Sequence, residues 1–309
     1  MKEKRQLVVN SENGFVVFLD VHFGKKCGIR VDDVDLAIID KLKQILLYCI
    51  ENNIKAVLTA GDIFDGVNVS RTALFQSWQI FNEFKKNRIE VFVIFGNHDL
   101  YRGNYNISQE TPLYFLIQTG VVKLYPKLLT VQNGQSEYNI SAFSYHEEIK
   151  ENELGYKNSV LIAHTFYDNE FMGKGHNLTK EDIIRLKYDK VILGHDHSRY
   201  NDVKLENGYK LFRFGSLARV STTPGELSRE IGFMHFNYDS EFFVGLITRK
   251  LEEIAKAETK KAKEITVDYT EIIDEIQKSS ADIKEDDLIL KKVNSINNEF
   301  VKKIILENI

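Results

Sequence analysis

One local pattern occurs five times in this sequence: a short run of apolar residues is followed at once by Asp, Asn or His. In the central example, residues 91–94 lead into Phe95-Gly96-Asn97-His98-Asp99. Runs of β-branched and aromatic residues predict buried strands, and α/β sheets bind ligands at the carboxyl ends of their strands. Taken alone, one such block fits a capped turn as well as it fits a binding site.

The other four blocks change that balance because they are built in the same way. They are Asp20-Val21-His22 after 15–19, Gly61-Asp62-Ile63-Phe64-Asp65 after 56–59, His164 after 160–163, and Gly194-His195-Asp196-His197 after 191–193. Strand ends that each carry a carboxylate, an amide or an imidazole predict one metal site, assembled from segments far apart in the chain.

The residues between the blocks predict an α/β fold. Strands are predicted at 15–19, 55–59, 89–95, 159–163, 190–193 and 209–214, helices at 35–48 and 70–84, and further strands within 231–248. Alternating strands and helices of this length favour βαβ units. Later in the chain, Asn133-Gly134 and Glu206-Asn207-Gly208 are typical of hairpin turns. We therefore expect a sandwich of two mixed sheets with helices outside.

The composition changes after Thr248. Residues 249–309 contain no Gly or Pro and are rich in charge, and Ile289, Val293, Ile296, Phe300 and Ile304 recur at helical spacing. We predict a main domain over 1–248 and a small helical appendage over 249–309. This appendage either caps the main domain or docks a partner protein.

The composition restricts the setting and the mode of binding. The formal charge of −4 means that contact with nucleic acid has to come from local basic patches. Cys27 and Cys49 favour reduced thiols over a disulfide framework. Because no run approaches a membrane span or a signal sequence, we expect a cytoplasmic protein of a bacterial cell, or a phage protein in the host cytoplasm, with no membrane partner.

The side chains in the blocks define the chemistry of the predicted site. The candidate ligands are Asp20, His22, Asp62, Asn97, His164, His195 and His197. This mixture of carboxylate, amide and imidazole suits Mn²⁺, Fe²⁺ or Zn²⁺ better than Ca²⁺ or Mg²⁺, and the lack of thiolates argues against a structural zinc site. Seven ligands are too many for one ion. Two ions that share a carboxylate would use them all, and such pairs act on phosphoryl groups.

In this order the five blocks resemble the calcineurin-like metallophosphoesterase superfamily over residues 15–220, which implies a four-layer sandwich. The resemblance implies one ion held by Asp20, His22 and His197, a second held by Asn97, His164 and His195, and Asp62 as the bridge between them. It identifies His98 as the catalytic histidine that protonates the leaving oxygen. It also implies that Asp65 and Asp99 orient His98 or Asn97 from outside the metal shell.

Several segments resemble one branch of that superfamily, the nuclease subunit of the SbcCD exonuclease and its T-even phage relatives. They are Gly61 to Asp65, Leu100-Tyr101 after the central block, Ala163 to Phe166, Tyr188 to Val191, Phe214 to Ser221 and Glu230 to Phe233. This branch implies a Mn²⁺-dependent DNA exonuclease or endonuclease of repair, recombination or replication. It also implies an SMC-like ATPase as partner, and a homodimer is compatible with it.

Two other functions stay open from the sequence. The same two metals would serve a phosphatase acting on a phosphoprotein or a small monoester, which the negative net charge favours. Alternatively, the metal site is degenerate and the protein is a scaffold whose role is binding. Candidate phosphate contacts are Lys25, Lys26, Arg30, Arg102 and Arg219, and candidate base-stacking residues are Tyr101, Tyr105 and Tyr145. His146, His176 and His235 lie outside the blocks and are predicted to be structural or exposed.

Overall fold

The computed structural model describes residues 6–26, 30, 32–101, 104, 109–152, 155–168, 177–205, 208–219, 224–249 and 254. The predicted helical appendage therefore lies outside the described residues, apart from Arg249 and Ile254, and its boundary remains a prediction. Cys27 also lies outside them, whereas Cys49 is a buried free thiol.

The first sheet has six strands in the order β15-β14-β2-β3-β4-β5. Its parallel part consists of β2 (Phe15–Phe18), β3 (Ala56–Thr59), β4 (Glu90–Val93) and β5 (Lys123–Leu124). The hairpin of β14 (Gly232–Phe236) and β15 (Glu241–Gly245) joins it antiparallel to β2. The predicted strands within 231–248 thus complete this sheet.

The second sheet has seven strands in the order β1-β6-β7-β8-β11-β13-β12. They are β1 (Gln6–Asn10), β6 (Leu128–Gln132), β7 (Glu137–Phe143), β8 (Ser159–His164), β11 (Lys190–Gly194), β12 (Val203–Lys204) and β13 (Lys210–Phe212). Pairs β6–β7 and β12–β13 are antiparallel, as the two hairpin turns predicted, and the other pairs are parallel. A small parallel pair, β9 (Phe166–Tyr167) and β10 (Asn177–Leu178), lies apart from both sheets.

The side chains of the strands alternate between two cores, which produces the layers. In β2, Val16 and Phe18 pack with helices α1 (Val34–Glu51), α2 (Arg71–Lys86) and α3 (Pro112–Gln118). Phe15 and Val17 instead enter the core between the two sheets. Since successive side chains of a strand point to opposite faces, a strand buried on both faces requires a layer on each side.

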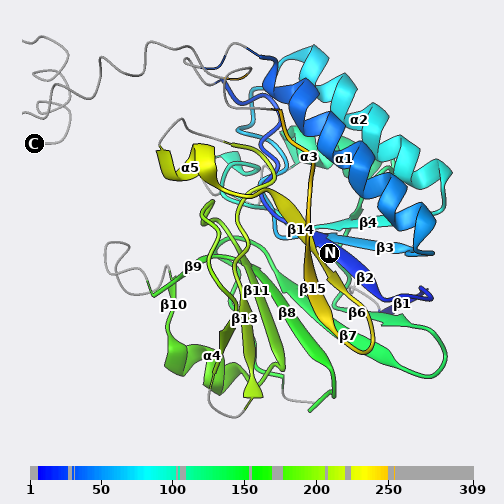
Figure 1. Ribbon diagram of the computed structural model, residues 1–309, viewed down its shortest axis with the longest axis vertical. Coiled ribbons are helices and arrows are strands. Elements are labelled where there is room, and N and C mark those ends of the chain that lie inside the picture. The colour runs from blue at the N-terminus through cyan, green and yellow to red at the C-terminus, as the bar shows by residue number, and fades with distance from the viewer. Residues whose placement is uncertain are drawn as a thin grey trace, which may run out of the picture. The chain divides into compact units, whose positions relative to one another are not determined.

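The same alternation holds in the second sheet. In β8, Val160 and Ile162 face the core between the sheets, whereas Leu161 and Ala163 pack with α4 (Lys180–Leu186). The order of layers is therefore helices, six-stranded sheet, seven-stranded sheet and helix, and Figure 1 shows α1 and α2 outside one sheet and α4 outside the other. The predicted four-layer sandwich is confirmed. A short fifth helix, α5 (Pro224–Ser228), precedes β14.

Local signals explain where the long helices begin. The Ser70 side chain accepts a hydrogen bond from the main-chain nitrogen of Ala73 and so caps α2, and Asp33 caps α1 in the same way. Strand β1 and helix α3 were not predicted from the sequence. Strand β1 pairs only with β6, more than a hundred residues later, and such pairing leaves little trace in local sequence.

Candidate metal centre

The five blocks meet at one edge of the sandwich, where hydrogen bonds join the two sheets. The Nδ1 atom of His164, at the end of β8, lies 2.6 Å from the carbonyl oxygen of Ala60, just beyond β3. The main-chain nitrogen of His195, just beyond β11, donates to Oδ1 of Asp20 at 3.0 Å. The block after β2 is bonded to the block after β3, with Val21 donating to the oxygen of Asp62 at 2.8 Å. All five strand ends thus form one site.

The seven side chains predicted as ligands fall into two groups. In the first group, one donor atom from each of Asp20, His22, Asp62 and His197 lies within 4.8 Å of the others. The Nε2 atoms of His22 and His197 are only 2.9 Å apart, which is typical of imidazoles that face a common point.

In the second group, donor atoms of Asp62, His164 and His195 lie within the same 4.8 Å limit. The Asn97 Oδ1 atom is 2.9 Å from Nε2 of His164, so it faces the same point. Asp62 belongs to both groups. The structure therefore brings together all seven residues, with one carboxylate between two donor sets.

The two carboxylates of the site have oxygen atoms that the protein itself does not satisfy. Asp20 and Asp62 are fully buried, and within the described chain Oδ2 of each has no hydrogen-bond partner. A buried carboxylate oxygen without a partner is costly, so native structures pair such atoms or place a metal on them. The donor set and these two orphaned oxygens fit a pair of divalent cations.

Burial and neighbouring charges shift the pKa values of the predicted ligands in different directions. Burial raises the pKa of Asp20 to about 8, and the Asp62 carboxylate adds to that rise. Burial would also raise the pKa of Asp62, but the imidazoles of His164, His22 and His98 outweigh it and hold that pKa below its usual range. Burial and the neighbouring imidazoles lower the pKa of His195 to about 3, and that of His197 to about 3. Burial would lower the pKa of His164, but the Asp62 and Asp20 carboxylates outweigh it and raise that pKa to about 9. Metal ions bind the neutral imidazole and the ionised carboxylate, so an ion here would displace protons from Asp20 and His164.

The backbone at the site is held in an unusual conformation. Asp20, His22, Asp62 and His195 have φ angles of 34°, 58°, 49° and 86°. The left-handed region is unfavourable for residues with a Cβ, and its occupation is concentrated at functional sites. Four of the seven predicted ligands are therefore positioned by backbone geometry that only the surrounding fold maintains.

Two glycines allow the close approach of the blocks. A Cβ on Gly96 would lie 2.0 Å from Oδ1 of Asp62, and one on Gly61 would lie 2.8 Å from Nδ1 of His164. Gly61 also has a φ of 95°. The glycines in the two blocks are thus required by the spacing of the ligands.

His98 lies at the rim of the site and is oriented by the main chain. Its Nδ1 atom is 2.9 Å from the carbonyl oxygen of Asp65, which can only accept, so Nδ1 carries a hydrogen. Its main-chain nitrogen donates to Oδ1 of Asp62 at 2.9 Å. Nε2 is therefore the ring atom left for a substrate.

Asp65 and Asp99 both contact the blocks that carry the predicted ligands. The Asp65 carboxylate lies 3.2 Å from Nδ1 of His22 and 2.9 Å from Nζ of Lys25, so it orients His22, whereas its carbonyl orients His98. The buried Asp99 carboxylate accepts from the main-chain nitrogens of Ile63, Phe64 and Gly96. It joins two blocks to each other and contacts neither the His98 nor the Asn97 side chain in the bonds described.

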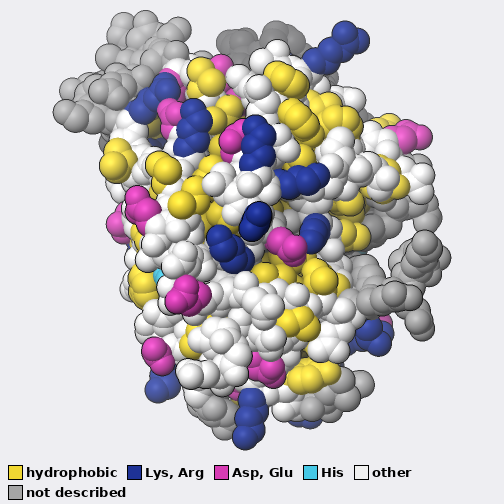
Figure 2. All heavy atoms as spheres, turned by 90° about the vertical axis from the view of Figure 1, so that its right-hand side faces the viewer, with side chains coloured by type: hydrophobic (Ala, Val, Ile, Leu, Met, Phe, Trp, Pro, Cys, Tyr) yellow, Lys and Arg dark blue, Asp and Glu magenta, His cyan; other side chains and the backbone are white. Residues whose placement is uncertain are grey.

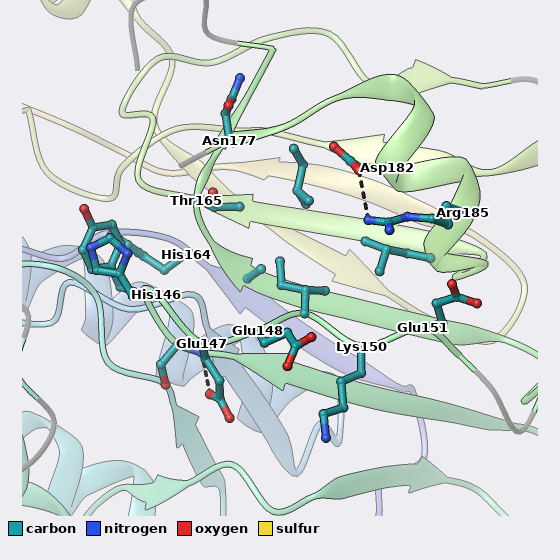
Figure 3. A pocket seen from close by; sticks show the side chains of 16 residues that line it. His146, Glu147, Glu148, Lys150, Glu151, His164, Thr165, Asn177, Asp182 and Arg185 are labelled. Atoms are coloured by element: carbon teal, nitrogen blue, oxygen red, sulfur yellow. Dashed lines mark hydrogen bonds and ion pairs between the residues drawn. The ribbon is translucent and has the colours of Figure 1, made fainter. Parts of the chain in front are cut away.

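A cavity of about 820 Å³ includes His164 in its wall and extends toward α4. Figure 3 shows Glu147, Glu148 and Lys150 on one side of it, and Asp182 and Arg185 of α4 on the other. The aromatic rings of Tyr145 and Phe166 flank His195, with centroids 5.6 and 4.0 Å from its ring. Phe166 was not predicted, although its position two residues after His164 places it on the same face of the chain.

The remaining candidates have varied positions. Lys25 lies at the site through Asp65, and Lys26 is exposed. Arg30 is paired with Asp32, and Arg219 donates to main-chain carbonyls of Glu226 and Arg229, so both are held within the protein. His235 is buried between the Tyr48 hydroxyl and the Asn13 carbonyl, as a structural histidine would be. Arg102, Tyr105 and His176 lie outside the described residues.

The family model for calcineurin-like phosphoesterases matches residues 15–199. The match covers more than half of the sequence, and the chain therefore belongs to this family. A family of phosphoesterases and a site with two sets of metal-binding side chains define the chain as a metal-dependent hydrolase.

Among curated proteins, the chain is similar to the DNA double-strand break repair protein Mre11 of Methanocaldococcus jannaschii, with 28% identity over 202 residues. The match covers 60% of this chain and 51% of the relative, so the chain spans about half the length of that protein.

Among solved structures, a dimetal phosphatase from Danio rerio has 13% identity and a TM-score of 0.49, covering 76% of this chain and 96% of that one. GAP50, the anchor in the inner membrane complex of Plasmodium, has 13% identity and a TM-score of 0.42, covering 77% and 90%. In the described part of this chain, no helix combines the length and the apolar character needed to cross a membrane.

Proposed function

We propose that this chain is a two-metal DNA nuclease that hydrolyses phosphodiester bonds. The observation that carries the proposal is the pair of donor groups that share Asp62, since two adjacent ions serve in-line displacement at phosphorus. The similarity to a protein named for DNA double-strand break repair supports DNA as the substrate. Action in DNA repair, recombination or replication follows from that substrate.

We assign the ligands as the two donor groups suggest. Asp20, His22 and His197 would hold one ion, Asn97, His164 and His195 would hold the other, and Asp62 would bridge them. Imidazole together with amide and carboxylate oxygen favours Mn²⁺, with Fe²⁺ and Zn²⁺ as the other candidates. When bound, the two ions would supply an activated water and neutralise charge on the phosphate.

His98 would then complete the reaction as a general acid. Its Nδ1 hydrogen is engaged by the Asp65 carbonyl, so the ring presents Nε2 to the leaving oxygen. To act as the acid the ring would be in its imidazolium form, in which Nε2 also carries a hydrogen. Transfer of that proton to the leaving oxygen would contribute about 10²–10⁴-fold to the rate and leave the ring neutral. Asp65 acts as a positioning residue for both His22 and His98, and Asp99 fixes the two loops that carry Asp62 and Asn97.

A metallophosphatase acting on a phosphoprotein or a small monoester is the second candidate. It is favoured by the acidic side chains Glu147, Glu148, Glu151 and Asp182 around the cavity beside His164, because they would repel a long polyanion. Figure 2, which views the molecule from the right-hand side of Figure 1, shows Lys and Arg side chains mixed with Asp and Glu on that face. No continuous basic surface is visible on that face.

A direct comparison of substrates separates the two candidates. Purified protein would be stripped with a chelator, reloaded with Mn²⁺, Mg²⁺, Zn²⁺ or Fe²⁺, and assayed on end-labelled single- and double-stranded oligonucleotides and on nitrophenyl phosphate. We expect cleavage of DNA that depends on metal and is highest with Mn²⁺. Asp62→Asn protein purified in parallel controls for contaminating nucleases.

A higher kcat/KM on the monoester than on DNA would replace the nuclease with the phosphatase. Full recovery with Mg²⁺ alone would contradict the choice of Mn²⁺. The labelled ends also report the polarity of cleavage and distinguish exonuclease from endonuclease activity.

The partners follow from the SbcCD-like segments of the sequence. We propose an SMC-like ATPase as the partner subunit, and self-association of the chain as a homodimer. Light scattering after size-exclusion chromatography, of the chain alone and mixed with an SMC-like ATPase from the same genome, tests both. A monomeric chain that does not co-elute with the ATPase would contradict them.

A further inference from the structure

A lysine is buried in helix α1 without a partner. Lys41 exposes only 5% of its surface. Within the described residues it makes no hydrogen bond or ion pair, although the ammonium group can donate three hydrogen bonds. Lysine is almost never buried unless it is paired. The position of Lys41 therefore needs an explanation that α1 by itself does not give.

Lys41 lines a cavity of about 280 Å³ that is separate from the metal centre. The charged residues around the cavity are Arg30, Asp32, Asp40, Lys41, Arg219 and Arg249. They come from the N-terminal half of α1 and the segment before it, from the segment before α5, and from the chain beyond β15. Four of these six side chains are cationic.

The two carboxylates of the cavity are already engaged by arginines. Asp32 accepts two hydrogen bonds of 2.7 Å from the Arg30 guanidinium, a bidentate pair whose side chains are about 95% buried on both sides. One guanidinium nitrogen of Arg249 lies 3.6 Å from Oδ2 of Asp32, and the other lies 3.5 Å from Oδ2 of Asp40. The Asp40 side chain is largely exposed. Neither carboxylate is within ion-pair distance of Lys41 in the described structure.

Behind the cavity a further arginine adds to the positive charge. Arg229 is buried, pairs with Glu226, and donates to Ser216 and Ala218. Burial lowers the pKa of Lys41 to about 7, and Arg30, Arg219 and Arg229 lower it further than Asp32 can raise it. Among the described residues, the cationic side chains around Lys41 thus outnumber the carboxylates, and no carboxylate lies within ion-pair distance of it.

We propose that the cavity around Lys41 binds a phosphate group. An anion placed there would accept hydrogen bonds from Lys41 and Arg249 and would balance the excess of cationic side chains. The volume is just below the range of about 300–1,000 Å³ that is typical of whole small-molecule sites. It therefore suits one phosphate group better than an entire nucleotide.

The wall of this cavity is connected to the metal centre through the main chain. Arg219 lines the cavity, and its carbonyl oxygen accepts from Arg30 at 3.2 Å. In the same segment, Ser216 donates to the carbonyl of His197 at 3.2 Å, and Leu217 donates to that of Asp20 at 3.0 Å. One short segment therefore contacts both the proposed phosphate site and two predicted metal ligands.

Two sources could supply the phosphate group. It could be free phosphate, or it could be a phosphate of a nucleic-acid chain that does not itself react. The proposal concerns binding only, so it stands whether the chain proves to be a nuclease or a phosphatase.

The test compares Lys41→Met with Lys43→Met in metal-loaded protein. Methionine keeps most of the side-chain volume and removes the charge, and Lys43 is an exposed lysine two residues away on the same helix. Binding of inorganic phosphate is followed by calorimetry. Binding of a phosphorothioate single strand is followed by fluorescence anisotropy at several salt concentrations.

We expect the affinity of this cavity for inorganic phosphate to be about 10- to 100-fold lower in Lys41→Met than in the wild type. This factor corresponds to the loss of one hydrogen bond to a charged group. Lys43→Met should behave as the wild type. If the phosphate comes from nucleic acid, the affinity for the single strand falls in Lys41→Met. The slope of the logarithm of the binding constant against the logarithm of the salt concentration then becomes smaller by about one. If the source is free phosphate, the single strand binds unchanged.

Arg249→Gln gives a second variant at the rim of the cavity, where the side chain is 40% exposed and the fold is not at risk. Arg249→Gln should weaken the same binding of phosphate as Lys41→Met does. Phosphate and single-strand binding that are equal in the wild type, Arg249→Gln and Lys43→Met would overturn the proposal, whether or not Lys41→Met folds.

Discussion

The metal centre and the Lys41 cavity both bury charge that the protein does not neutralise, but the charge has opposite sign. At the metal centre the orphaned atoms are the Oδ2 oxygens of Asp20 and Asp62, surrounded by imidazoles. In the cavity it is the Lys41 ammonium that has no hydrogen bond or ion pair among the described residues, and arginines lie around it. The first arrangement favours cations, and the second favours an anion.

The two sites also differ in how the fold builds them. The metal centre uses strained backbone at strand ends, with positive φ at four of its seven predicted ligands. Lys41 lies in regular helix α1, and only its surroundings are unusual. The difference teaches that a site can be encoded in its own residues or in what the rest of the chain packs around an ordinary residue.

The most severe test of the metal centre is Asp62→Asn. Asp62 belongs to both donor groups, so the change weakens the attraction for both ions. We expect activity to fall by about 10⁴-fold or more, because each ion supplies several kcal/mol of charge stabilisation. Activity assays and metal analysis of the purified variant check this. Asp196→Asn is the matched control, since the Asp196 carboxylate bonds to Ser198 and Tyr200 and to none of the predicted ligands in the bonds described. Equal activity of both variants would refute the bridging role.

Next in expected effect is His98→Asn, which separates catalysis from metal binding. The variant should keep both metals and lose about 10²–10⁴-fold in turnover on DNA, the contribution of a general acid. A nitrophenyl phosphodiester, whose leaving group needs no proton, should lose much less. Loss of a metal equivalent, or equal losses on both esters, would remove the general-acid assignment.

Removal of the metals tests the charge balance at the centre. Ions that bind only the folded state stabilise it by about 4 kcal/mol when they are present at a thousand times their dissociation constant. We therefore expect a chelator to lower the melting temperature of the wild type and to have little effect on Asp62→Asn. Differential scanning calorimetry with and without chelator measures the difference; no shift in the wild type would show that the orphaned oxygens hold no ion.

The smallest effect is expected at the Lys41 cavity, where the substitution should make the protein more stable rather than less active or less stable. Burial of a charge without a partner is costly, so an apolar side chain of similar volume removes that cost. When buried ion pairs are replaced in this way the gain reaches about 1–4 kcal/mol, and we expect a gain of that order here. Lys41→Met should therefore be more stable than the wild type in phosphate-free buffer, and added phosphate should reduce the gap. Chemical denaturation with and without phosphate measures both values. A less stable variant in phosphate-free buffer would show that Lys41 has a partner.

The same residue predicts how stability depends on pH. Burial lowers the pKa of Lys41 in the folded state from 10.5 to about 7; Arg30, Arg219 and Arg229 lower it as well, and Asp32 raises it. Between these two values the unfolded state binds more protons, so the Lys41 contribution to the free energy of unfolding rises with pH. The contribution is fully unfavourable below pH 7. Subtracting the profile of Lys41→Met from that of the wild type isolates it, and a flat difference would contradict the lowered pKa.

Much of the metal centre could be predicted from the sequence because its information is local. Each block places polar ligands directly after a run that can only be a buried strand, and parallel strands of a sheet end at a common edge. For that reason the sandwich and the meeting of Asp20, Asp62, Asn97 and His164 were expected before any coordinates. The caps at Asp33 and Ser70 and the two hairpins have the same local origin.

The finer roles could not be predicted because they depend on which atom meets which. A sequence shows that Asp65 and Asp99 lie near the ligands, but not that one uses its carbonyl on His98 while the other bonds three main-chain nitrogens. Main-chain donors and acceptors are the same at every position. Their pairing is decided by the packing of loops that are more than thirty residues apart in the chain.

By itself, then, the sequence determined the class of fold and the set of side chains available to metals, since strand periodicity and ligand chemistry are local properties. The two groups around Asp62 were implied before by the resemblance to a family, and the structure adds the proximity of their donor atoms. Only the tertiary structure decided that Lys41 is enclosed by positive charge. On an isolated helix Lys41 would be solvated like Lys43. It is buried because residues near 219, 229 and 249 pack around that turn of α1, and such contacts across the chain exist only once the fold is complete.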